Sequence, residues 1–240
     1  MARQDQTIAK YGDWETEATL IAQRLLNEAI MNGVIKNDIL KMDGKFGDRT
    51  YDVARAFQRA NGKLTIDGIV GPKTFEALGL IKGVDYPVRL RGQPTVMTCW
   101  SACTKMLNGG ADKPPVLANK TPAGGLATGD ANLRFYAADI GAKFNAAPIT
   151  LGQFAVMLNR VPLWVGGLIK NHASGAAMHV VIYAGVFRYN FSGTEHVVKI
   201  FDPWPVGQGS KYFAKLMKPD LQNAGEFTPL WFLEPNVFVP

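Results

Sequence analysis

The most reactive side chains in this 240-residue chain are those of its two cysteines, Cys99 and Cys103. Cys99 follows a segment rich in Pro and Thr and begins a helical pattern that runs to Leu107. Thr98 is placed to cap that helix through its hydroxyl. The free N–H groups and the dipole of a first helical turn favour negative charge, which stabilises a thiolate. Because the thiolate is the reactive form, Cys99 is the candidate nucleophile.

A nucleophilic thiol needs a base, and the chain has three histidines. His172 lies in a loop of small residues and His196 follows Glu195, so we expect both at the surface. His179 instead opens a β-prone apolar run, where a buried strand would hold its ring firmly. Asp202 ends the next apolar run. These positions predict a triad of nucleophile, base and orienting acid.

The same residues carry a family resemblance. Gln93 stands six residues before Cys99-Trp100, His179 opens one strand and Asp202 closes the next. This order resembles the papain-like cysteine peptidases, above all their compact bacterial branch of effector proteases and bacteriocin-exporter peptidase domains. The resemblance implies that Cys99 is the nucleophile, His179 the base, Asp202 the orienting acid and Gln93 an oxyanion-hole donor.

The chain departs from the plant and lysosomal enzymes in two places. Val96-Met97-Thr98 precedes the nucleophile where those enzymes have Cys-Gly-Ser, and the third triad residue is Asp rather than Asn. We interpret both as differences between branches, and they leave the subsites and the substrate open. Trp100 is expected to anchor the helix in the core, and Trp204 to cover the His179–Asp202 pair.

Metal chemistry is not expected. Cys99 and Cys103 lie one helical turn apart, and no Cys/His pair with ligand spacing lies near them. Cys103 is therefore predicted to be a small buried core residue. We expect no metal and no cofactor.

The composition is that of a globular protein, with 47% hydrophobic residues, 14 Pro and 25 Gly. The longest apolar runs are too short to span a bilayer, so no membrane insertion is expected. The first residues lack the apolar core of a signal peptide. We expect a protein made in the cytoplasm, then exported by a dedicated system or released, to act in the periplasm or cell wall of a target cell.

Charge is distributed unevenly along the chain. Residues 1–85 contain 12 basic and 12 acidic side chains, whereas residues 86–240 contain 14 and 8, so the excess of six lies in the second part. Its basic residues are scattered rather than gathered in a dense stripe with aromatics. This pattern favours an anionic surface and argues against nucleic acid as a partner.

The N-terminal part is predicted to be helical. After a polar, poorly ordered stretch over residues 1–14, helical spacing runs from Glu17 to about Met31 and from about Arg49 to Ala60, and a short third helix contains Phe75. The segments at residues 43–48 (DGKFGD) and 67–72 (DGIVGP) share the pattern Asp-Gly-x-x-Gly, and each precedes a predicted helix. They are therefore predicted to form the same type of turn twice.

This double turn, with the segment AFQRANG at residues 56–62 between its copies, resembles the three-helix peptidoglycan-binding domain of many cell-wall hydrolases over about residues 17–80. The resemblance implies binding to glycan strands or stem peptides. The apolar residues of this part are nevertheless expected in its core, and the same fold serves elsewhere as a prosegment or a docking module.

The remainder is predicted to be an α+β domain with an antiparallel sheet. Residues 82–91 read as a linker or first edge strand, residues 109–129 as a surface segment forming a substrate-binding wall, and residues 211–217 as a short helix. Further helices are capped by Asp130 and Thr150, and strands cover residues 162–169, 179–187, 197–201 and 230–233. We expect a three-helix domain over residues 1–82 and a papain-like domain, with its Cys-bearing helix packed on the sheet, over residues 83–240.

The leading hypothesis is a metal-independent cysteine peptidase or amidase that cuts peptidoglycan stem peptides or cross-bridges. It would be an antibacterial effector, such as a type VI toxin, or a phage lysin, and its partners would include an immunity protein or a secretion-machine component. In the alternative, the enzyme cleaves a host or rival protein and the helical domain serves delivery or docking. A third possibility is a binding protein with a vestigial site.

Overall fold

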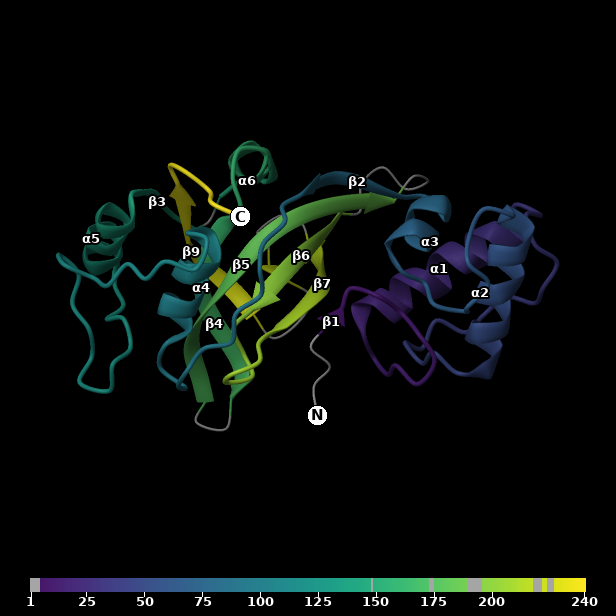
Figure 1. Cartoon of the computed structure of the whole chain (residues 1–240), viewed down its shortest axis with the longest axis horizontal. Coiled ribbons are helices and arrows are strands. Elements are labelled where there is room, and N and C mark those ends of the chain that lie inside the picture. The colour runs from purple at the N-terminus through teal and green to yellow at the C-terminus, as the bar shows by residue number, and fades with distance from the viewer. Residues whose placement is uncertain (1–4, 148, 173–174, 190–195, 218–221, 224–226) are drawn as a thin grey trace. The chain divides into compact units, whose positions relative to one another are not determined.

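The computed structural model describes residues 5–147, 149–172, 175–189, 196–217, 222–223 and 227–240 (Figure 1). The chain forms two compact units. The N-terminal unit comprises residues 5–83 with the strand ends at 187–189 and 196, and the C-terminal unit comprises residues 84–186 and the described residues from 197 onward.

The N-terminal unit is built on three helices, α1 (Glu17–Met31), α2 (Asp48–Asn61) and α3 (Pro72–Ala77). The predicted spans of the first two are confirmed within a residue at each end. Thr16 caps α1 by accepting a hydrogen bond from the Thr19 N–H, and Pro72 occupies the first turn of α3, where its missing N–H costs nothing. The buried faces of these helices form the core of the unit.

Gln58 on α2 holds the second of the two repeated turns. Its Nε2 donates to Asp67 Oδ1 at 2.9 Å and to the Ile69 carbonyl at 3.0 Å, and its Oε1 accepts from the Gly68 N–H at 2.8 Å. The side chain is 1% exposed. A buried amide thus satisfies backbone groups that the turn itself cannot pair.

Gln23 on α1 holds the first turn in the same way. Its Nε2 donates to Asp43 Oδ1 and to the Lys45 carbonyl, both at 3.1 Å, and its Oε1 accepts from the Gly44 N–H at 3.0 Å. The repetition seen in the sequence is therefore also a repetition of hydrogen bonds.

The prediction of poor order is wrong for residues 5–14, while residues 1–4 lie outside the described chain. Ala9 exchanges two backbone hydrogen bonds with Val70, at 3.1 and 2.8 Å, and the Phe46 N–H donates to the Asp13 carbonyl at 2.8 Å. A short strand, β1 (Asp5–Gln6), precedes these contacts. The segment is ordered by backbone pairing with both turns, which its polar composition does not reveal.

The C-terminal unit contains a sheet in the order β7-β6-β5-β4-β9-β3. The pairings β4–β5, β4–β9, β3–β9 and β7–β8 are antiparallel, and β2 pairs with β5. Apart from β1, the described strands of the chain are β2 (Leu80–Asp85), most of which belongs to the N-terminal unit, β3 (Ala142–Ala146), β4 (Leu163–His172), β5 (Gly175–Tyr189), β6 (His196–Asp202), β7 (Ser210–Met217), β8 (Gln222–Asn223) and β9 (Phe227–Pro235).

Helices cover both faces of this sheet. The helices α4 (Cys99–Leu107) and α5 (Asp130–Ile140) share one hydrophobic cluster with Trp164, Val180 and Ile182. The helix α6 (Leu151–Leu158) shares another with Val165 and Val181 on the opposite face. Because neighbouring residues of a strand point to opposite faces, β4 and β5 supply both cores. The unit is a mixed α/β structure with a large sheet.

Several local predictions need correction. The helix predicted over Lys211–Met217 is strand β7, because β6 and β8 flank it and provide pairing partners that are distant in sequence. Residues 86–91 form no strand, and β2 precedes them. Strand β3 was not predicted. Thr150 caps α6 through a capping box as expected, but Gly129 rather than Asp130 is the N-cap of α5. The other predicted strands are confirmed.

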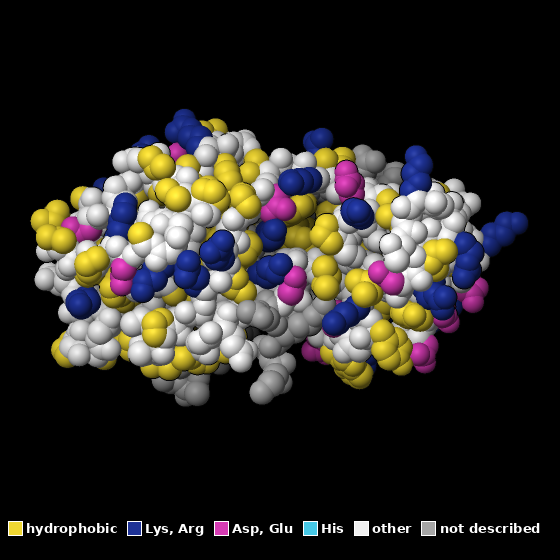
Figure 2. All heavy atoms as spheres, viewed as in Figure 1, with side chains coloured by type: hydrophobic (Ala, Val, Ile, Leu, Met, Phe, Trp, Pro, Cys, Tyr) yellow, Lys and Arg dark blue, Asp and Glu magenta, His cyan; other side chains and the backbone are white. Residues whose placement is uncertain are grey.

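The visible surface of the C-terminal unit carries more Lys and Arg than Asp and Glu side chains, in line with its positive charge (Figure 2). Several of the basic groups are paired, for example Lys199 with Asp85 at 2.7 Å, Lys105 with Asp112 at 3.1 Å and Arg160 with Glu234 at 3.3 Å. Across the described residues, each helix is too short or too polar to cross a bilayer.

Replacing Gln58 with Leu should destabilise the N-terminal unit. The buried N–H of Gly68 and the carbonyl of Ile69 would lose their partner, and each unpaired buried group costs about 1–3 kcal/mol. Urea unfolding followed by circular dichroism measures this loss. Arg59→Ala, an exposed position on the same helix, is the control. An unfolding free energy equal to that of the control would contradict the role of Gln58.

Candidate active site

The helix α4 is fixed to the sheet by contacts one turn beyond its start. The Cys103 thiol, with no exposed surface, donates to the Val180 carbonyl of β5 at 3.3 Å. The Trp164 indole N–H of β4 lies 3.4 Å from the Trp100 carbonyl. Cys103 is thus the buried core residue that was predicted, and Trp100, 6% exposed, belongs to the same core. These contacts determine where Cys99 lies.

The N-terminus of α4 differs from the sequence prediction. Thr98 is the N-cap residue, but its side chain makes no capping hydrogen bond. Its hydroxyl instead accepts from the Thr95 N–H and donates to the Thr95 carbonyl, both at 3.0 Å. The first N–H groups of the helix therefore have no side-chain cap, and they remain suited to stabilise negative charge at Cys99.

His179 and Asp202 are in direct contact. His179 lies near the start of β5 and Asp202 at the end of β6, and His179 Nε2 is 2.7 Å from Asp202 Oδ1. The Trp204 N–H donates to the same carboxylate oxygen at 2.8 Å. Cys99 and His179 line the same cavity, and a hydrogen bond with the Cys99 side chain is among the effects that raise the His179 pKa. The structure brings these three predicted residues together.

The charge of His179 is set by two opposing effects. Burial alone lowers its pKa, but the Asp202 carboxylate, the hydrogen bond to it and the Cys99 side chain outweigh burial and raise the pKa to about 10. The protonated imidazolium is therefore the stable form at neutral pH. Such a cation beside Cys99 favours the thiolate.

Gln93 lies in the loop that leads into α4. It is 1% exposed, and its Nε2 donates to the Thr95 carbonyl at 2.8 Å. Its backbone is tied to the loop after Asp202, since its N–H donates to the Pro203 carbonyl at 2.9 Å and its carbonyl accepts from the Gly207 N–H at 2.8 Å. The loop after Asp202 thus fixes the position of Gln93, which is not among the residues that line the cavity beside Cys99.

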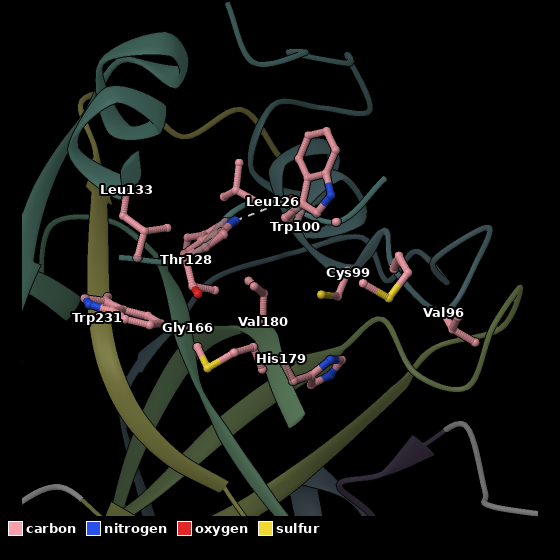
Figure 3. A pocket seen from close by; sticks show the side chains of 14 residues that line it. Val96, Cys99, Trp100, Leu126, Thr128, Leu133, Gly166, His179, Val180 and Trp231 are labelled. Carbon is pink, nitrogen blue, oxygen red and sulfur yellow. Dashed lines mark hydrogen bonds between the residues drawn. The ribbon is translucent and has the colours of Figure 1, made fainter. Parts of the chain in front are cut away.

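A cavity of about 90 Å³, partly open to solvent, adjoins Cys99 and His179. Cys99 and His179 lie at one end, Leu133 and Trp231 at the other, and Val180 between them (Figure 3). The segment predicted as a substrate-binding wall contributes Gly125, Leu126 and Thr128 to the lining. The cavity therefore lies between the start of α4 and the sheet, beside the Cys99 thiol.

Sequence reasoning missed the part of this cavity that comes from strands. Gly166 on β4 stands opposite Val180 on β5 and Trp231 on β9, and all three line the cavity. The pair Gly166-Gly167 inside an apolar strand was an available signal, because glycine in a strand often marks a close approach.

The side chains of His196 and Trp204 are not among those that line the cavity. His196 is half-buried at the start of β6, and the side chain of His172 lies outside what the structure describes. Trp204 contacts Asp202 through its backbone, and its side chain is 46% exposed. In the part of the chain that is described, no three His, Cys, Asp or Glu side chains gather as metal ligands would.

Comparison with known proteins bears on the N-terminal unit alone. Residues 15–78 match the family model of a peptidoglycan binding domain. This match supports the resemblance seen in the double turn, a cell-wall-related function, and peptidoglycan as a binding partner. No curated protein matches the chain.

The two cysteines should differ sharply in reactivity. Burial, followed by the charges of Cys99 and Asp202, raises the pKa of the Cys103 thiol well above its ordinary value, so Cys103 should not form a thiolate. Iodoacetamide under native conditions should label Cys99 and leave Cys103 unmodified, as read by peptide mass spectrometry. Both should react in urea. Native labelling of Cys103 at a rate similar to Cys99 would contradict the described packing.

The His179 titration tests the carboxylate contact. NMR should give a pKa of about 10 for the His179 imidazole. Removing the negative charge in Asp202→Asn should lower that pKa by about 1–3 units, because the carboxylate favours the protonated ring. Unchanged backbone amide signals of β6 outside the neighbourhood of residue 202 would show that the variant keeps the fold. An unchanged His179 pKa would argue against the contact.

Proposed function

We propose that the protein is a papain-like cysteine hydrolase that cuts amide bonds at the bacterial cell wall. The observation that carries the proposal is the placement of His179, with Asp202 2.7 Å from Nε2 and the Cys99 side chain within reach of the ring. A thiol at a helix start, an imidazole and a half-buried carboxylate that orients it are the parts used in nucleophilic acyl transfer.

Acylation follows from this arrangement. The Cys99 thiolate attacks the carbonyl carbon of the amide, and the carbonyl oxygen takes up the negative charge. The backbone N–H of Cys99, at the uncapped helix start, and the Gln93 Nε2 would donate to that oxygen. The His179 imidazolium gives its proton to the leaving nitrogen, the C–N bond breaks, and a thioester to Cys99 remains.

Deacylation reverses the proton flow. His179, now neutral, takes a proton from water, and the resulting hydroxide attacks the thioester carbonyl. The C–S bond breaks, the acid leaves, and the Cys99 thiolate and the His179 imidazolium are restored. Asp202 holds the ring in one orientation and stabilises its charged form throughout both steps.

The N-terminal unit supplies the proposed location. A peptidoglycan-binding domain would hold the hydrolase on its substrate, where the amides of stem peptides and cross-bridges are concentrated. The positive charge of the C-terminal unit would add attraction to an anionic surface. These properties suit an antibacterial effector delivered into a target cell, such as a type VI toxin held in check by an immunity protein, or a lysin.

In the second candidate function, the same reaction cleaves a protein instead of peptidoglycan. The observation that favours it is the lining of the cavity, which contains no charged side chain apart from the Cys99–His179 pair. Stem peptides carry charged residues beside most of their amides, whereas a protein can offer an apolar segment.

Digestion of purified sacculi tests the proposal and separates the two candidates. The wild type and Cys99→Ala are each incubated with sacculi and, separately, with unfolded proteins, and products are identified by mass spectrometry. New muropeptides with the wild type alone would support wall hydrolysis and identify the bond. Protein fragments with intact sacculi would support the second candidate. No product from either substrate, with folded protein, would exclude hydrolysis and leave a binding protein.

Gln93→Ala should reduce turnover without removing the nucleophile. Loss of one oxyanion donor costs about 100–1000-fold in rate, while the contact between Cys99 and His179 is untouched. The readout is kcat on the substrate found above, together with the rate of Cys99 alkylation. Val156→Ala, an exposed position on α6, is the control. A kcat within about threefold of the wild type would exclude Gln93 from the oxyanion hole.

A further inference from the structure

Two aromatic side chains of the N-terminal unit lie in solvent. Trp14 is 64% exposed and Tyr11 is 58% exposed, whereas the three phenylalanines of the unit, Phe46, Phe57 and Phe75, are buried. The core of the unit therefore takes up the phenylalanine rings and leaves these two rings in water. Large apolar side chains that gather at a surface commonly mark a binding site.

The backbone on both sides of Trp14 is held by the first of the two repeated turns. The Phe46 N–H donates to the Asp13 carbonyl and the Glu15 N–H donates to the Gly44 carbonyl, both at 2.8 Å. Trp14 therefore projects from a fixed backbone. A ligand that contacts it has to order the side chain alone, which lowers the entropic cost of binding.

Each of the two rings is supported on one side. Lys45 Nζ lies 4.5 Å from the centroid of the Trp14 ring, so Lys45 lies over one face of the indole and leaves the opposite face to solvent. The Tyr11 ring contacts the Tyr51 ring edge to face, with the centroids 5.9 Å apart and the planes at 78°. The Asp48 carboxylate raises the pKa of Tyr11, first through a hydrogen bond with the hydroxyl and then through its charge. That hydrogen bond also fixes the direction of the Tyr11 side chain.

Both repeated turns contribute to this surface. Lys45 belongs to the first turn and Gly68 to the second. A Cβ at Gly68 would lie 2.2 Å from Tyr51 Cε2, so the Tyr51 ring packs against the backbone of the second turn. We call Tyr11, Trp14, Lys45 and Tyr51 the aromatic platform.

We propose that the aromatic platform binds the glycan strands of peptidoglycan, with sugar rings stacked on Trp14 and Tyr11. The faces of a pyranose ring carry C–H groups with a small positive charge, and the face of an aromatic ring is negative. A rigid indole with one face in solvent suits this contact. Lys45 places a cation beside the same ring, where a carboxylate of the polymer can pair with it.

The inference rests on the peptidoglycan-binding match of residues 15–78 and not on the proposed hydrolysis. Tyr11 and Trp14 precede the matched residues, so the match itself assigns them no role. Residues 1–85 have as many basic as acidic side chains, which gives no general attraction to the charged stem peptides. The uncharged sugar rings are therefore the part of peptidoglycan that the platform fits best.

Titration calorimetry with soluble parts of peptidoglycan tests the platform. The full chain carries Cys99→Ala, so that no probe is cleaved during the measurement. One probe is glycan strands freed of their stem peptides by an amidase, and the other is the stem peptides alone. The glycan strands should bind, and the stem peptides should show no saturable binding.

Substitutions on the platform separate ring stacking from general apolar contact. Trp14→Leu keeps an apolar side chain but removes the ring, so it should weaken strand binding by about 3–10-fold, and Tyr11→Ala should weaken it similarly. Trp14→Phe keeps a ring and should bind within about twofold of the parent. Met31→Ala, which removes an apolar side chain that is 68% exposed on α1, is the control. Unfolding free energies equal to that of the parent show that each variant is folded.

The possible failures of the platform and of the hydrolysis are separate. Unchanged strand binding in Trp14→Leu and Tyr11→Ala would overturn the platform, as would binding of the stem peptides alone or of neither probe. None of these results depends on turnover, because the tested chains lack the Cys99 thiol. A chain that binds strands through Trp14 but leaves sacculi uncut with Cys99 intact would keep the platform and exclude the hydrolase.

Discussion

The packing of α4 against β4 and β5 is the constraint on which the site depends. The contacts of Cys103 with Val180 and of Trp164 with Trp100 join the helix to the sheet. Both contacts are buried, so the Cys103 thiol and the Trp164 indole N–H cannot form hydrogen bonds with water instead. With the helix fixed, its first residue, Cys99, has to lie beside the part of β5 that carries His179, in the interior of the sheet. A shift of the helix by one turn would separate the two side chains.

The electrostatics of the site follow from burial. His179 is 7% exposed, and an isolated imidazolium there would be costly. The carboxylate of Asp202 compensates for that cost, and the Trp204 N–H holds the carboxylate in place. The loop after Asp202 also binds the backbone of Gln93, so the proposed acid and the proposed oxyanion donor share one support. The apolar cavity next to them strengthens these interactions by excluding water.

Much of this site could be predicted from the sequence because its key positions are local features. A cysteine at a helix start, a histidine at the start of an apolar run and an aspartate at the end of the next are each visible within a few residues. The strand β7 was mistaken for a helix because its pairing partners are distant in sequence. The cavity could not be predicted, since Gly166 and Trp231 meet only through the register of β4 with β9.

The proposed chemistry requires that His179 activates Cys99. The alkylation rate of Cys99 with iodoacetamide at neutral pH, compared between the wild type and His179→Ala, measures this activation, and unlabelled Cys103 shows that the fold is intact. Cys99 in the wild type should react at least about tenfold faster, because the imidazolium stabilises the thiolate. Equal rates in two folded proteins would contradict it.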